Sequence, residues 1–172
     1  MTQQNREINT MEATKLANVY YNEGRKLASS HMEVGEDLHD LVCRYIVGYT
    51  NMAFACEIAL KVLIVSQGGT PKVFPQRHLL SELVSLLRDD VKTAVVHVTK
   101  VRYVENTKNE YSDADFYQDL EKYSDAFVKA RYWYERQPDG ESQNAGIAFM
   151  TAFAGAVVWM ISIGQEAKGI KK

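Results

Sequence analysis

The chain has 172 residues, of which 46% are hydrophobic and 24% charged, with 10 Gly and 3 Pro. These values predict one globular domain over residues 1–172 and exclude disordered and collagen-like chains. The net charge of −2 at pH 7 excludes a protein that holds duplex nucleic acid through an overall basic field. Any nucleic-acid contact therefore has to use a local patch or a partner.

Apolar residues keep helical spacing through most of the chain. After a polar tail over residues 1–10, the predicted helices cover residues 11–32, 36–66, 78–87, 91–104, 112–134 and 142–167. Gly24 lies on the apolar face of the first helix and predicts a close approach to another helix. The second helix is apolar nearly all round from residue 51 onward, which is typical of the centre of a bundle. No hairpin signal occurs, so we predict an all-α, up-and-down bundle of five to six helices.

The two cysteines predict a reducing compartment. Cys43 and Cys56 lie on the same predicted helix, about 20 Å apart at 1.5 Å per residue, which is too far for a disulfide. We expect both to be reduced core thiols. The first ten residues hold no apolar secretion segment, and we expect a soluble, cytoplasmic protein.

Residues 145–164 carry no charge and are long enough to cross a bilayer. Half of these 20 residues are Gly, Ala, Ser or Thr, which makes them a poor membrane span. A buried core or dimer helix is the preferred interpretation, and a membrane anchor is the alternative. Small residues at Ala148, Ala152 and Gly155 would let another helix approach closely, which predicts a homodimer or a higher oligomer.

Several short motifs occur in a fixed order: Tyr20-Tyr21, the stretch Asn51 to Lys61 (NMAFACEIALK), Gly68 or Gly69, His78-Leu79-Leu80 with Leu83 and Leu87, and Phe127 followed by Arg131 to Glu135 (RYWYE). In this order they resemble stand-alone bacterial HEPN domains (higher eukaryotes and prokaryotes nucleotide-binding) over roughly residues 12–167. The resemblance implies an antiparallel helical bundle that often pairs into a homodimer.

Many HEPN proteins are metal-independent ribonucleases of toxin–antitoxin and phage-defence systems that use an Arg-x4–6-His motif. Others lack the motif and bind nucleotides or RNA, or serve as partners of small nucleotidyltransferases. No His follows Arg131 in this chain. The resemblance therefore favours an accessory, non-catalytic module that binds a nucleotide, RNA or a partner protein such as an antitoxin or nucleotidyltransferase. The alternative is a metal-independent endoribonuclease with a non-standard active site.

The main site candidates are Arg131, Glu135 and Glu57. Glu57 stands on the most apolar helix and needs a cation. In one interpretation it forms a structural pair with Arg131 or Lys61. In the other, Arg131 faces a ligand phosphate in a groove with Glu135 beside it, because guanidinium groups bind phosphate through two hydrogen bonds.

Secondary candidates are His78, which opens a helix, and the Arg25–His31 pair, whose spacing matches the ribonuclease motif on the wrong helix. Histidine ionises near neutral pH, so His78 or His31 could act in acid–base chemistry. For His78 a structural role is the preferred interpretation.

Tyr132 and Trp133 could stack on bases, although core packing is the competing interpretation for both.

His39 and Cys43 are one turn apart on one helix, which is half of a zinc site. No second pair with metal-ligand spacing occurs, so no metal is predicted. Walker-type, dinucleotide-binding and nucleophile-elbow signatures are absent, and no cofactor is predicted.

Overall fold

A computed structural model of the chain describes residues 8–31, 35, 37–70, 78–131 and 140–169, and the side chains of 130–145 and 166–169 lie outside this description. Within these ranges every regular element is a helix: α1 Thr10–Ala28, α2 Leu38–Ser66, α3 Leu80–Ser85, α4 Asp89–Thr107, α5 Asp113–Lys122, α6 Ala126–Arg131 and α7 Gly140–Gly169. The predicted all-α class is confirmed. The described residues hold seven helices rather than five or six.

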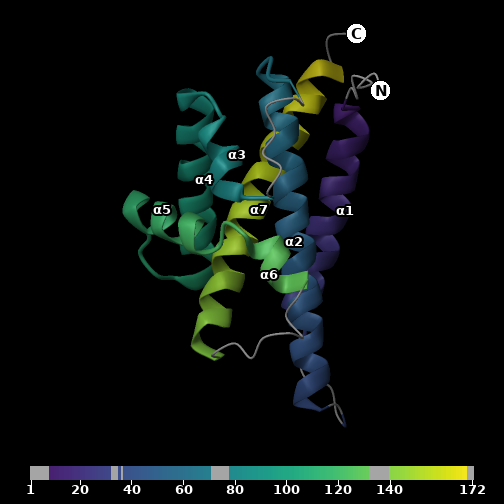
Figure 1. Ribbon diagram of the computed structural model, residues 1–172, viewed down its shortest axis with the longest axis vertical. Coiled ribbons are helices and arrows are strands. Elements are labelled where there is room, and N and C mark those ends of the chain that lie inside the picture. Colours follow the sequence, from purple (N-terminus) through teal and green to yellow (C-terminus); the bar gives the residue numbers. More distant parts are fainter. Residues whose placement is uncertain (1–7, 32–34, 36, 71–77, 132–139, 170–172) are drawn as a thin grey trace, which may run out of the picture.

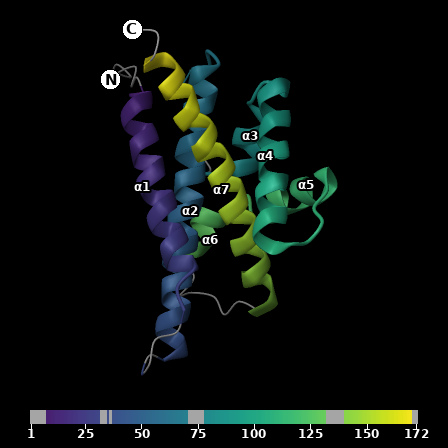
Figure 2. The same cartoon turned by 180° about the vertical axis from the view of Figure 1, so that it is seen from behind.

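The long helices α1, α2 and α7 lie side by side, and α4 packs on the other flank of α7 (Figure 1). The short helix α6 lies against α2, and α5 is outermost beside α4. Seen from behind, α7 runs between α1 and α4 (Figure 2). The N-terminal end of α2 projects beyond the ends of α1, α6 and α7 in both views.

The core is built by the second half of α2 and by α7. From Met52 to Ile64 most side chains of α2 are buried, which confirms its predicted central place. Phe149 and Phe153 of α7 stack on each other at 5.3 Å, and both pack edge-on against Phe116 of α5. All three rings are fully buried, so the aromatic packing fixes α5 onto α7.

Gly24 marks the predicted close approach, and its partner is Gly48 of α2. A Cβ atom on Gly24 would lie 2.7 Å from the carbonyl oxygen of Gly48, and the reverse distance is also 2.7 Å. No other residue fits at either position without moving backbone. The two glycines therefore allow α1 and α2 to touch along their backbones.

The predicted single helix over residues 112–134 is wrong, because the chain breaks at residues 123–125 into α5 and α6. Ser112 does cap α5, in a capping box with Asp115. At the break, Ser124 accepts hydrogen bonds from the N-terminal amides of α3: its carbonyl binds the N–H of Leu80 and its Oγ binds the N–H of Ser81, each at 2.9 Å. α3 has no capping side chain of its own, so a residue 43 positions away supplies its cap.

The helix predicted over residues 78–87 is shorter, Leu80–Ser85. The helical spacing predicts that Leu80, Leu83, Leu86 and Leu87 all face inward, and Leu80, Leu83 and Leu87 are buried. Leu86 is 40% exposed, because the helix has ended by this residue and the chain turns towards α4.

The predicted burial of both cysteines holds only for Cys56. The Cys56 side chain is fully buried, and burial raises the pKa of its thiol well above the ordinary value. Cys43 is exposed, so its prediction as a core thiol is wrong. The physical reason is its place on the projecting end of α2, which the core does not reach.

Two helical segments, Leu38–Ser66 and Gly146–Gln165, are long and apolar enough to cross a membrane by length and composition alone. More than half of each apolar window is buried inside the bundle. The small residues of α7 contact helices of the same chain: Ala152 is fully buried, and a Cβ on Gly155 would lie 2.5 Å from the Oη of Tyr21. These residues therefore serve packing within the chain, and the homodimer stays a prediction.

Candidate functional site

A buried carboxylate lies at the centre of the candidate site. The Glu57 side chain is 3% exposed and stands on α2 among apolar neighbours. Lys61, one turn later on the same helix, places its Nζ 2.5 Å from Oε1 of Glu57. This is one of the two ion pairs expected from the sequence. Because both partners belong to α2, the pair satisfies the buried charge but does not join two helices.

His78 is the partner that joins Glu57 to another segment. Its Nδ1 lies 2.8 Å from Oε1 and 3.0 Å from Oε2 of Glu57. A carboxylate only accepts hydrogen bonds, so Nδ1 carries the proton and Nε2 is the second, outward nitrogen of the ring. The His78 side chain is 47% exposed, and within the described residues no hydrogen bond engages Nε2.

The backbone around His78 is held by the same contacts that break the predicted long helix. His78 closely precedes α3, whose first amides are bound by Ser124. Ser124 in turn lies in the short connection into α6. The position of the histidine is therefore set from both sides, by Glu57 of α2 and by the α5–α6 junction.

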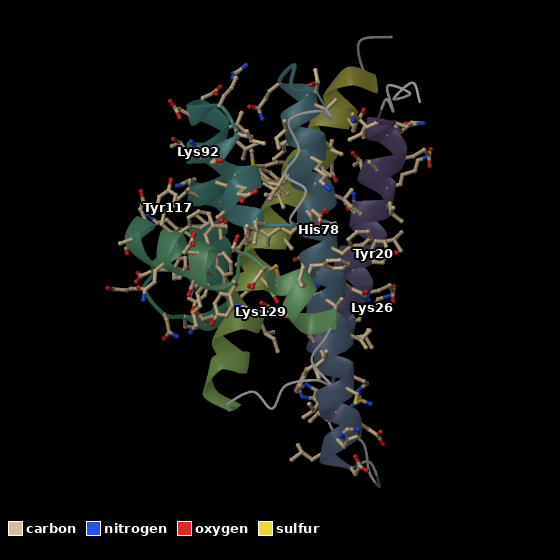
Figure 3. All side chains as sticks on the ribbon, in the orientation of Figure 1. Tyr20, Lys26, His78, Lys92, Tyr117 and Lys129 are labelled. Carbon is tan, nitrogen blue, oxygen red and sulfur yellow. The ribbon has the colours of Figure 1, made fainter. Side chains whose placement is uncertain are left out.

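A row of aromatic rings leads from α1 to this histidine. Tyr20 meets Phe54 edge-on at 4.8 Å, Phe54 stacks on Phe127 of α6 at 5.2 Å, and the Phe127 ring lies 5.6 Å from that of His78. All three aromatic side chains are half-buried. In Figure 3 His78 lies between Tyr20 on α1 and Lys129 on α6. The site is thus an exposed imidazole beside a partly exposed apolar surface.

The structure separates the candidates into those it brings together and those it does not. Glu57 and His78, weighed separately in the sequence, form one cluster. Arg131 is the last residue of α6, four positions after Phe127, and its side chain lies outside the described residues. Tyr132, Trp133 and Glu135 also lie outside the described residues.

Arg25 and His31 lie elsewhere in the molecule. Both side chains are exposed, and the carbonyl of His31 accepts a hydrogen bond from Arg44 at 3.0 Å. Arg44 precedes Glu57 by 13 residues on α2, which places this contact about 20 Å from Glu57 along the helix axis. The pair does not contribute to the Glu57–His78 cluster.

A second group of ionisable side chains comes from α4, from α5 and from the loop that joins them. The Oη of Tyr111 donates a hydrogen bond of 2.8 Å to Asp119, and the Tyr111 ring stacks on that of Tyr103 at 3.9 Å. Burial raises the pKa of Asp119 above its ordinary value, and burial together with the hydrogen bond to Asp119 raises the pKa of Tyr111. These groups hold the loop after α4 onto α5, which is a structural role.

Sequence reasoning did not predict the Glu57–His78 contact, although one signal for it was present. A glutamate on the most apolar helix must meet a cation or a hydrogen-bond donor, and lysine, arginine and histidine side chains can supply both. The residues were 21 positions apart, and a loop of unknown path separated them. Chemically, the arrangement holds an imidazole in one tautomer with its second nitrogen at the surface, as expected of a hydrogen-bonding or proton-transfer group.

The fold and this cluster define an all-α bundle in which a buried glutamate, paired with a partly exposed lysine, orients a surface histidine. Comparisons with known proteins gave no match: no family model, no curated protein and no solved structure is significantly similar to the chain. The function therefore has to be inferred from the site.

Proposed function

We propose that the chain is an HEPN-like accessory module that binds a nucleotide or RNA through a phosphate group at the Glu57–Lys61–His78 cluster. In this proposal it works in the cytoplasm as a non-catalytic member of a toxin–antitoxin or defence system. The imidazole of His78 donates to the phosphate through Nε2 when protonated. Lys61 contributes positive charge beside it, and Arg131 at the end of α6 supplies the guanidinium.

The observation that supports the proposal is the convergence of the sequence motifs. Glu57 and Lys61 come from the motif on α2, His78 opens the His-Leu-Leu-x-x-Leu motif, and Phe127 begins the motif that contains Arg131. These segments are far apart in the sequence, and they meet around a single carboxylate and one pair of rings. A convergence of this kind is expected if the order of motifs reflects one shared fold and site.

The side chains at the surface of the cluster indicate the class of ligand. His78 presents a donor at its Nε2 when protonated, and the half-buried rings of Phe54 and Phe127 lie next to it. Aromatic surfaces stack on bases, and cationic donors bind phosphates, so the combination suits a nucleotide or single-stranded RNA better than a duplex. The net charge of −2 agrees with a small or local nucleic-acid contact.

Fluorescence anisotropy with a labelled single-stranded RNA of about 12 nucleotides, and with fluorescent adenosine and guanosine nucleotides, tests the proposal. Arg131→Ala and His78→Ala are each expected to weaken binding about tenfold, the effect of losing one charged hydrogen bond. Arg88→Ala is the matched control, because Arg88 is exposed and pairs with its neighbour Asp90.

Melting curves separate the two roles of Arg131. If Arg131 binds ligand, Arg131→Ala keeps its melting temperature and loses binding. If Arg131 is structural, the same variant melts earlier and its affinity for RNA or nucleotide stays unchanged, which overturns its part in the site. Failure of the native chain to bind any of these probes overturns the proposal itself and leaves a protein partner as the ligand class.

One observation favours a second candidate, a metal-independent endoribonuclease. A carboxylate that fixes Nδ1–H leaves Nε2 as an acceptor, so neutral His78 could take the proton from a ribose 2′-hydroxyl. The 2′-oxygen would then attack phosphorus and displace the 5′-oxygen, which takes a proton from water, to give a 2′,3′-cyclic phosphate and a 5′-hydroxyl. Cleavage of RNA in EDTA with this product, lost in His78→Ala, would establish the enzyme; intact RNA would exclude it.

A further inference from the structure

The exposed pair His39 and Cys43 lies far from the Glu57–His78 cluster, near the start of α2. Both side chains are exposed, and Nε2 of His39 lies 3.6 Å from Sγ of Cys43. This part of α2 projects beyond the ends of α1, α6 and α7 (Figures 1 and 2). The pair is therefore open to groups from outside the chain.

The distance between the two atoms matches the separation of two ligand atoms on one tetrahedral metal ion. Zinc lies about 2.0–2.1 Å from a histidine nitrogen and about 2.3 Å from a thiolate sulfur. At a tetrahedral angle these bonds place nitrogen and sulfur about 3.5 Å apart. His39 and Cys43 already hold this separation because they are one helical turn apart on one face. A zinc ion could bind both without any change in the helix.

The described part of one chain offers too few ligands for a closed site. Among the described residues no group of three or more His, Cys, Asp or Glu side chains could hold a metal ion. A structural zinc site takes four nitrogen or sulfur ligands. A two-fold axis through the metal would bring the same pair from a second copy and complete a Cys₂His₂ set.

We propose that His39 and Cys43 form half of a zinc site that is completed by the same two residues of a second copy of this chain. The zinc ion then bridges two α2 helices, and each Cys43 releases its thiol proton to solvent on binding. The homodimer expected from the sequence is formed in this way at α2, away from the small residues of α7.

The surroundings of the pair suit a second copy. Val47, one turn after Cys43, is 50% exposed. Its large apolar side chain lies on the same side of α2 as the pair, so a crossing helix would bury it beside the metal. Arg44, next to Cys43, bonds Ser30 and the carbonyl of His31 on the side facing α1, which directs its guanidinium away from the pair.

Cobalt substitution of the full chain, in the presence of a phosphine reductant, tests the site. We expect the visible d–d bands of tetrahedral Co²⁺, a thiolate-to-cobalt charge-transfer band and saturation at about one ion per two chains. In sedimentation experiments Zn²⁺ is expected to raise the mass about twofold over the same sample in EDTA. The reductant excludes a dimer formed by a Cys43–Cys43 disulfide.

Variants at exposed positions provide the specificity test, because they leave the core intact. Cys43→Ser and His39→Ala should each abolish the cobalt spectrum and the zinc-dependent dimer. His97→Ala, at another exposed histidine on α4, should change neither. Retention of the thiolate band in Cys43→Ser, saturation at one ion per chain without a change in mass, or no metal bound at micromolar concentration would each overturn the proposal. RNA and nucleotide binding do not enter these measurements, so the result is independent of the proposed function.

Discussion

Gly24 of α1 and Gly48 of α2 meet backbone to backbone, and a Cβ atom on either would lie 2.7 Å from the carbonyl oxygen of the other. This contact sets the distance between the two helices at this crossing point. It is rigid, because the atoms that would have to move belong to helical backbone. The contact therefore reverses the usual effect of replacing a helical glycine.

Gly24→Ala and Gly48→Ala are each expected to lower the free energy of unfolding by about 1–3 kcal/mol, the usual cost of overpacking. Gly164→Ala is the matched control. Gly164 also lies inside a helix, α7, but a Cβ atom added there would meet no atom within 4 Å, so the change should stabilise by about 0.5–1 kcal/mol. Urea unfolding of the three variants measures this; stabilisation by Gly24→Ala would contradict the close contact.

Two substitutions in the Glu57 cluster are expected to lower the free energy of unfolding by different amounts. Lys61→Met removes the cation on α2, so that His78 is the one remaining partner of the buried carboxylate among its contacts given above. This substitution should lower the free energy of unfolding by about 3 kcal/mol. Glu57→Gln should cost less, about 1–2 kcal/mol, because Lys61 and His78 are partly exposed and regain water. Exposed Glu82→Gln on α3 is the control. Equal or reversed losses in chemical unfolding would show that burial of Glu57 is not the dominant cost.

Because Ser124 caps α3, a substitution at Ser124 should destabilise a helix that is distant in the sequence. Ser124→Ala removes the Oγ that accepts the N–H of Ser81 and should lower the free energy of unfolding by about 1 kcal/mol. Ser85→Ala is the control, because the Ser85 hydroxyl is exposed and bonds the carbonyl of Glu82 in the same helix. An equal effect of the two substitutions in thermal melts would argue against a cap supplied from the α5–α6 junction.

The raised pKa of Asp119 predicts how stability changes with pH. Because burial raises this pKa, the folded chain binds the proton more tightly than the unfolded chain. The resulting stabilisation is complete below the ordinary pKa and is lost as the pH rises through the raised pKa. Asp119→Asn cannot ionise and keeps an acceptor for the Tyr111 hydroxyl, so it should melt higher than the native chain at about pH 7, with the difference shrinking at about pH 3.

Exposed Glu121→Gln on the same helix is the control for this pH series and should follow the native chain. A lower melting temperature of Asp119→Asn at neutral pH would contradict the sign, and would mean that the Tyr111 hydrogen bond to the carboxylate outweighs its burial.

The amino-acid sequence alone was sufficient for the fold class and for the main buried helices. Periodic apolar residues predicted α2 as the central helix and α7 as a long apolar helix, and Gly24 as a close contact. The helix predicted from residue 112 onward begins where Ser112 caps α5. These features depend on residues within one or two helical turns, where backbone geometry and side-chain chemistry act locally.

Tertiary structure decided the features that depend on contacts between segments far apart in the sequence. The apolar pattern through residues 112–134 is continuous, yet the chain breaks at Ser124 because the free amides of α3 need acceptors there. Cys43 follows the same helical pattern as Cys56, but the core ends before it is reached. Burial and hydrogen bonding between elements are not encoded in the periodicity of either element alone.

The candidate site divides in the same way. The sequence singled out Glu57 as a charged residue on an apolar helix, and His78 as an ionisable residue at a predicted helix start. Their contact at 2.8 Å arises only when α2 and the segment before α3 are packed together. A buried carboxylate must find a donor, but many donors satisfy that requirement, and the path of the chain between the helices determines which one does.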